Sequence, residues 1–175
     1  MTSIRLLRSA ALSQFMLLLI FGSPVAFAES ASPPQKQGVQ GSWTLVSLYV
    51  EKDGSRTEAF GTAPRGSMVF TPDGHFSTIV MRANLPKFGS NSRTSGTDTE
   101  NQAVVQGSIA YFGTYTENKT DGTLSLRIEG STFPNWDGQV QLREFRVTNN
   151  ELRLINPSAA IGGAGYMVWK RAGSD

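Results

Sequence analysis

The side chains in this sequence that could contact a small molecule are aromatic and basic residues on or beside strand-like segments. Tyr111 and Tyr115 stand four residues apart in one such segment. Because side chains alternate across a strand, both phenols are expected to point to the same face. The full set of predicted ligand contacts is Tyr49, Met81, Tyr111, Tyr115, Trp136 and Arg143. Large side chains of this kind could equally serve to fill the core of a β domain.

Glu129 and Arg143 could form a second chemical feature, a cross-strand ion pair. A simple hairpin would place them opposite one another on consecutive strands. Leu124, Leu126 and Ile128 form the apolar face of the first strand, so the pair is expected on the outside, where it would contribute about 0 to 1 kcal/mol. Inside the domain, the same pair would anchor a carboxylate or phenolate.

Metal and nucleophilic chemistry lack the residues they need. The chain has one histidine, His75, and no cysteine, so a His or Cys metal site cannot be assembled. A Ser-His-Asp triad would depend on His75, which follows a Pro-Asp-Gly turn and is expected to be solvated. We therefore predict no metal site, no cofactor and no catalytic residue.

The elements that must position these side chains are strand-like runs separated by turn residues. Turns such as Lys52-Asp53-Gly54, Pro72-Asp73-Gly74 and Thr120-Asp121-Gly122 alternate with short apolar and β-branched runs. Strands are expected at residues 42–50, 56–60, 66–71, 75–82, 108–116, 123–131, 138–148, 151–155 and 165–171. The pattern predicts an all-β domain built as an antiparallel meander of about nine strands, arranged as a sandwich or a closed barrel.

One segment, residues 83–107, interrupts this regular alternation of strands and turns. Thr97 is followed three residues later by Glu100, the spacing of a capping box, which predicts a short helix from about Asp98 to Gln106. A long connection in a small β domain is commonly a lid or a mouth, so we expect this one over the opening of the barrel. The alternative is a disordered excursion with no role.

The N-terminus resembles a secretory signal peptide. Arg5 and Arg8 precede an apolar run over residues 10–22, and Ala26-Phe27-Ala28 offers small residues for cleavage after Ala28. The apolar run is shorter than the roughly 20 residues of a spanning helix, which argues against a retained anchor. We expect a signal peptide at 1–28, a disordered leader at 29–40 and a domain at 41–172, exported to a periplasm or secreted.

Composition fits one globular domain without a strongly charged partner. The chain has 175 residues, of which 39% are hydrophobic. Removing residues 1–28 takes two of the 16 basic side chains and none of the 14 acidic ones, so the remainder is formally neutral. Nucleic acid is therefore not an expected partner, and with no cysteine to carry a lipid we expect no stable membrane anchor. The sequence does not indicate an oligomeric state.

An ordered set of short motifs resembles the bacterial lipocalin-like domain family. The motifs are Gly41-Ser42-Trp43, Phe70-Thr71-Pro72-Asp73-Gly74, Met81-Arg82, Ile109-Ala110-Tyr111-Phe112-Gly113-Thr114-Tyr115, Phe133-Pro134-Asn135-Trp136, Arg143-x-Phe145 and Val168-Trp169-Lys170-Arg171. The resemblance implies a lipocalin-like antiparallel β-barrel of about eight to ten strands with one short helix. It further implies that Trp43 packs across the closed end beside Arg171 or Lys170. The family pattern often has histidine where this chain has Leu126 and Arg127.

Three function classes remain open. The leading hypothesis is an exported binding protein for a small hydrophobic or amphipathic ligand, because a barrel of this size can hold one ligand and no catalytic set is evident. The alternative is a barrel enzyme of isomerase, cyclase or lyase type, with Tyr111 or Tyr115 as acid and Glu129 or Arg143 holding charge. The third is an interaction module of the cell envelope, with residues 29–40 as a spacer.

Overall fold

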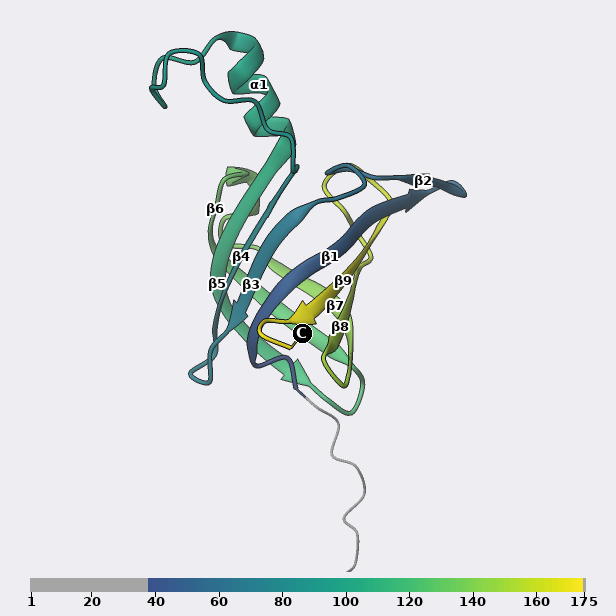
Figure 1. Ribbon diagram of the computed structural model, residues 1–175. Coiled ribbons are helices and arrows are strands. Elements are labelled where there is room, and N and C mark those ends of the chain that lie inside the picture. Colours follow the sequence, from purple (N-terminus) through teal and green to yellow (C-terminus); the bar gives the residue numbers. More distant parts are fainter. Residues whose placement is uncertain (1–37, 175) are drawn as a thin grey trace, which may run out of the picture. The chain divides into compact units, whose positions relative to one another are not determined.

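A computed structural model describes residues 38–174, which form a closed antiparallel β-barrel (Figure 1). The elements in chain order are β1 (Gly41–Lys52), β2 (Ser55–Thr57), β3 (Arg65–Phe70), β4 (His75–Met81), α1 (Asp98–Gly107), β5 (Ser108–Asn118), β6 (Thr123–Ser131), the 3₁₀ helix η1 (Pro134–Trp136), β7 (Val140–Thr148), β8 (Glu151–Asn156) and β9 (Ala164–Arg171). The expected signal peptide, residues 1–28, and residues 29–37 of the expected leader lie outside the described residues.

Closure comes from the pairing of β1 with β9. The sheet order is β2-β1-β3-β4-β5-β6-β7-β8-β9, and β1 also pairs with β9 along most of its length. Eight strands thus form the ring, and β2 extends β1 as a short hairpin. The prediction of an all-β, lipocalin-like barrel with one helix is confirmed.

Strand and helix positions follow the turn chemistry closely. Nine strands occur where nine were expected, although the run predicted at residues 56–60 is strand only over Ser55–Thr57. The helix begins with the predicted capping box: Thr97 Oγ1 accepts from the Glu100 amide at 3.3 Å, and Glu100 Oε2 accepts from the Thr97 amide at 2.8 Å. In residues 38–174, no helix is long and apolar enough to span a membrane.

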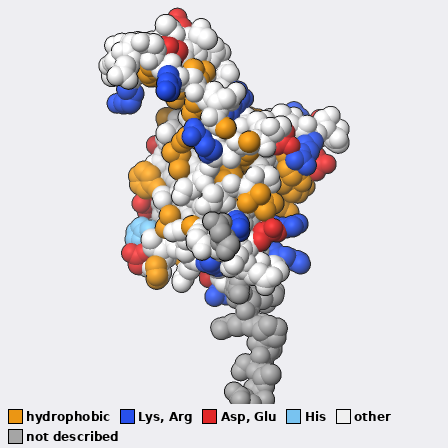
Figure 2. All heavy atoms as spheres, in the orientation of Figure 1, with side chains coloured by type: hydrophobic (Ala, Val, Ile, Leu, Met, Phe, Trp, Pro, Cys, Tyr) orange, Lys and Arg blue, Asp and Glu red, His pale blue; other side chains and the backbone are white. Residues whose placement is uncertain are grey.

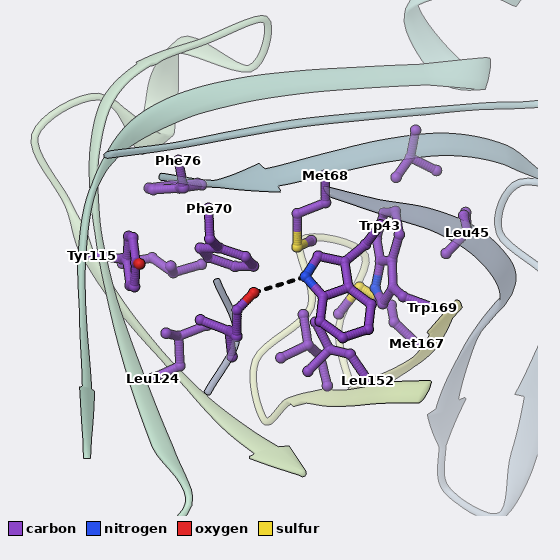
Figure 3. Packing of buried hydrophobic residues seen from close by; sticks show 14 of the residues in the cluster. Trp43, Leu45, Met68, Phe70, Phe76, Tyr115, Leu124, Leu152, Met167 and Trp169 are labelled. Carbon is purple, nitrogen blue, oxygen red and sulfur yellow. Dashed lines mark hydrogen bonds between the residues drawn. The ribbon is translucent and has the colours of Figure 1, made fainter. Parts of the chain in front are cut away.

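Side chains fill the end of the barrel near residues 38–43. Trp43 and Trp169 are almost fully buried there, with Met68 beside them (Figure 3). The Trp43 indole donates a hydrogen bond to the Val39 carbonyl at 2.7 Å, drawn dashed in Figure 3. The guanidinium carbon of Arg171 lies 4.2 Å from the centroid of the Trp43 ring, so Trp43 packs beside the basic residue as the resemblance implied.

Gly41 shows why a glycine precedes this tryptophan. Its φ is +120°, a conformation that side chains rarely adopt. A Cβ at this position would lie 2.7 Å from Nη1 of Arg171, which itself donates to the Gln40 carbonyl at 2.9 Å. The absence of a side chain at Gly41 therefore lets the arginine cross the closed end.

The domain begins earlier than predicted. Val39 is fully buried, and its amide donates to Glu117 Oε2 at 2.9 Å. Residues 38–40 therefore belong to the closed end of the barrel, and their assignment to a disordered leader is wrong. A single valine between Gly38 and Gln40 gives no periodic signal from which its burial could have been read.

The two buried indoles offer a matched test of this closed end. Trp169 Nε1 is buried without a hydrogen-bond partner, whereas Trp43 Nε1 is satisfied by Val39. Trp43→Phe should therefore lower the free energy of unfolding more than Trp169→Phe, by about 1 to 3 kcal/mol, because only the first leaves a buried carbonyl unpaired. Urea unfolding followed by far-UV circular dichroism measures both. Equal losses would show that the Trp43 hydrogen bond adds nothing beyond packing.

Candidate functional site

The opposite end of the barrel, near α1 and the β1–β2 hairpin, is not filled. A cavity of about 570 Å³ lies there, open to solvent on one side. Its walls are mostly apolar and aromatic and come from strands around the ring and the loops at the mouth: Leu48, Val50, Ala59, Phe60, Val80, Ile109, Tyr111, Phe133, Trp136, Ile161 and Met167. The barrel is thus packed at one end and hollow at the other.

A second hollow, of about 430 Å³, lies on the outer face of β3 to β6. It is bordered by small side chains such as Ser67 and Ser77 and by the exposed Ile79 and Phe112. No Arg, Lys, Asp or Glu borders it. The interior cavity combines apolar walls with a few polar groups, as ligand sites usually do, and we take it as the candidate site.

Arg143 on β7 is the most buried polar side chain of the cavity lining, with 4% of its surface exposed. Its Nη1 donates to Asn156 Oδ1 at 2.9 Å and to the Leu142 carbonyl at 3.0 Å, and its Nη2 donates to Gln141 Oε1. Burial lowers the pKa of Arg143, and interaction with Tyr111 opposes this effect. All these partners are neutral, and no carboxylate of residues 38–174 forms a salt bridge with Arg143.

The predicted pair between Glu129 and Arg143 does not form. Leu124 lies opposite Arg143, and Arg127 lies opposite Val140. This register differs from the simple hairpin by five positions, an odd number, which turns Arg143 inward while Glu129 stays exposed. Arg143 therefore lies inside the barrel as a polar group, but Glu129, its expected partner, is not beside it.

Tyr111 and Trp136 form an aromatic wall beside Arg143. The Tyr111 and Trp136 rings meet edge to face with centroids 5.3 Å apart, and Phe133 meets Trp136 in the same way at 5.7 Å. On the other side of Tyr111 lies Phe76, with centroids 5.9 Å apart. The short helix η1 positions Trp136 in this row. Both Tyr111 and Trp136 line the cavity, as does Arg143.

Tyr115 shares the inner face of β5 with Tyr111, as predicted from strand alternation, but it lies in the filled end (Figure 3). Its ring meets Phe70 edge to face with centroids 4.9 Å apart, and its hydroxyl donates to the Thr71 carbonyl at 2.9 Å. Burial, followed by the charge of Glu117, raises the pKa of Tyr115. Tyr115 does not line the cavity.

Tyr49 and Met81 point outward and do not line the cavity in which they were expected. A bulge at Val46 reverses the alternation of β1: Trp43 and Leu45 point inward before it, Leu48 after it. Tyr49 instead stacks on Tyr166 with centroids 5.0 Å apart, and the Arg56 guanidinium lies over its ring.

Met81 is on the outer face for a simpler reason. Phe76, Thr78 and Val80 are the buried residues of β4, so Met81 alternates outward with the exposed Ile79. Of the six predicted ligand contacts, the structure brings Tyr111, Trp136 and Arg143 together at the cavity. That these three contact a ligand remains a prediction.

Sequence reasoning missed two polar residues of the site, Arg82 and Asn156. Arg82 borders the cavity directly after β4; its Nη2 donates to the Ala59 carbonyl at 3.2 Å, and its buried Nε has no partner. Asn156 continues the inward alternation of Leu152 and Leu154 and is 8% exposed. Extending β8 by one residue beyond its predicted end would have revealed Asn156.

The segment 83–107 borders the mouth but does not cover it. Figure 1 shows α1 leading into the start of β5 and extending beyond the barrel. Only its last turn reaches the cavity, where Val105 and Gln106 contribute to the lining, and Val105 remains 76% exposed. In the view of Figure 2, apolar and charged side chains are interspersed around this end.

The side chains that could bind a metal ion are dispersed over the described part of the chain. No three His, Cys, Asp or Glu side chains of residues 38–174 gather where they could hold a metal ion. His75, at the start of β4, is exposed, and its Nδ1 lies 3.4 Å from the Asp73 carboxylate. It does not border the cavity.

Comparison with known proteins agrees with this architecture. A family model described as a lipocalin-like domain matches residues 40–172. A 4'-hydroxy-3'-methoxypropiophenone carrier protein from Aspergillus oryzae is 28% identical over 106 residues, which cover 54% of this chain and 95% of that protein. At the level of the family, a hollow barrel and a carrier relative support small-molecule binding. By fold and by sequence, the chain belongs to the lipocalin-like domain family.

Proposed function

We propose that this protein binds one small apolar or amphipathic molecule in the interior cavity. The observation that carries the proposal is the uneven filling of the barrel: buried side chains pack one end, while about 570 Å³ stays open at the other. Protein interiors are normally packed to high density, and a barrel with a purely structural role would be filled along its length. A volume of this size is typical of sites for small ligands.

The aromatic wall favours a ligand with a flat ring. Tyr111, Trp136 and Phe133 already meet edge to face, and a ring in the cavity could extend the same arrangement. The name of the Aspergillus oryzae relative describes an aromatic ring with hydroxyl, methoxy and ketone groups as its cargo. A ligand of similar character, one ring with polar substituents, suits the cavity of this chain.

We further propose that binding takes place outside the cytoplasm. The positive start, apolar run and Ala26-Phe27-Ala28 site support removal of residues 1–28 during export.

Two isoleucine substitutions test which hollow binds the ligand. Ile109 lines the cavity from β5, while Ile79 borders the outer hollow. Ile109→Trp should weaken binding of the uncharged dye N-phenyl-1-naphthylamine about tenfold or more, because the indole occupies ligand volume. Ile79→Trp, the matched control, should leave it unchanged. Fluorescence titration gives both constants. Loss of binding only in Ile79→Trp would move the site to the outer face.

Export can be tested by intact-mass measurement of the protein made in its own cells. The chain should begin at Glu29, because the small residues at 26 and 28 suit signal peptidase. Ala28→Lys should block cleavage and leave the full precursor, whereas Ala31→Lys, beyond the site, should not. A wild-type protein that keeps residues 1–28 would contradict the proposed export route.

A further inference from the structure

The cavity presents positive charge without a negative counterpart, and we propose that its ligand is an organic acid whose anionic oxygen binds Arg143. This inference rests on the proposed function and specifies its ligand class. A buried guanidinium is normally paired with a carboxylate, because removing an ion from water costs several kcal/mol. Within residues 38–174, the polar groups that interact with Arg143 are amide, carbonyl and phenol groups.

The other charges of the lining strengthen this imbalance. Glu58 is the acidic residue of the lining, but its Oε1 accepts from Arg56 Nη2 at 2.6 Å and from Arg56 Nε at 2.9 Å. Its charge is therefore already matched. Arg82 has a backbone carbonyl as its acceptor, and its buried Nε is unpaired. Two guanidiniums thus border one cavity, and no acid of the lining is free to neutralise them.

The apolar walls of the cavity indicate the character of the rest of the ligand. Arg143 lies beside Tyr111, so an acid bound to the guanidinium would place its hydrocarbon or aromatic body against the aromatic wall. Arg82 borders the same cavity, and its backbone amide donates to the Gly107 carbonyl at the end of α1. A carboxylate or phenolate on a ring or short chain meets both requirements, since arginine binds such oxygens with strong, charge-assisted hydrogen bonds.

A purely structural role for Arg143 makes a different prediction. If the arginine held β7 and β8 together through Asn156, its loss would destabilise the barrel. If instead Arg143 is a buried charge whose partner is the ligand, replacing it with an apolar side chain of similar length should leave the free energy of unfolding unchanged or raise it. Stability and ligand preference therefore separate the two roles.

Two dyes with the same aromatic body test the inference. 1-Anilinonaphthalene-8-sulfonate carries an acidic group, which N-phenyl-1-naphthylamine lacks. In Arg143→Met, affinity for the sulfonate should fall about tenfold or more, while affinity for the uncharged dye should stay within about twofold. Arg146→Met is the matched control, because Arg146 lies on the same strand with its side chain exposed, and it should change neither constant.

The outcomes are distinct for the inference and for the proposed function. If Arg143→Met weakens both dyes equally or neither, the inference is wrong while the cavity remains a binding site. If neither dye binds the wild-type protein, or both bind equally well to Ile109→Trp, the proposed function itself is contradicted. Failure of Arg143→Met to fold would show that Arg143 has the structural role, and Arg143→Lys then tests whether it also binds the ligand: retained preference for the sulfonate supports the inference, and loss of that preference with folding intact overturns it.

Discussion

Closure of the sheet through β1 and β9 is the constraint on which the rest of the structure depends. The register that joins these strands pairs Trp43 with Arg171 and Leu45 with Trp169. Two indoles are thereby fixed at one end of the ring, where Val39 supplies an acceptor for one of them. Buried side chains fill that end of the barrel, and the cavity lies at the other end.

The same geometry explains how a charged side chain comes to lie inside. Register between β6 and β7 is fixed by Leu124 facing Arg143, so β7 alternates with the arginine inward and the apolar Leu142 outward, where it is 57% exposed. An exposed leucine next to a buried arginine reverses the usual preference of both side chains. Such a local conflict is expected at functional sites rather than at positions chosen for stability. Burial lowers the pKa of Arg143, so an anion bound there would favour the charged guanidinium.

Local patterns predicted the elements well but the facing of side chains less well. Turn residues and the Thr97 capping box depend on neighbours in sequence, and the strands and helix appear where these signals lie. Whether a side chain points into the barrel or outward depends on single-residue bulges and loop lengths, which local patterns do not encode. One extra residue at Val46 turned Tyr49 outward, and the unforeseen register after β6 separated Glu129 from Arg143. On the unbulged strand β5, alternation placed Tyr111 and Tyr115 on the inner face as predicted.

The positions of Tyr111 and Tyr115 also limit which residues could act in the alternative hypothesis, a barrel enzyme. Tyr115, whose pKa is raised, donates a hydrogen bond to the Thr71 carbonyl in the filled end and does not line the cavity. Glu129 faces outward. Of the four groups named in the enzyme hypothesis, Tyr111 and Arg143 line the cavity, so the acid of that hypothesis would be Tyr111, with Arg143 holding charge. These are the same two groups that would bind an organic acid, so a catalytic reaction would begin from the complex that a carrier also forms. Binding is the step common to both functions, and turnover would require Tyr111 to transfer a proton within that complex.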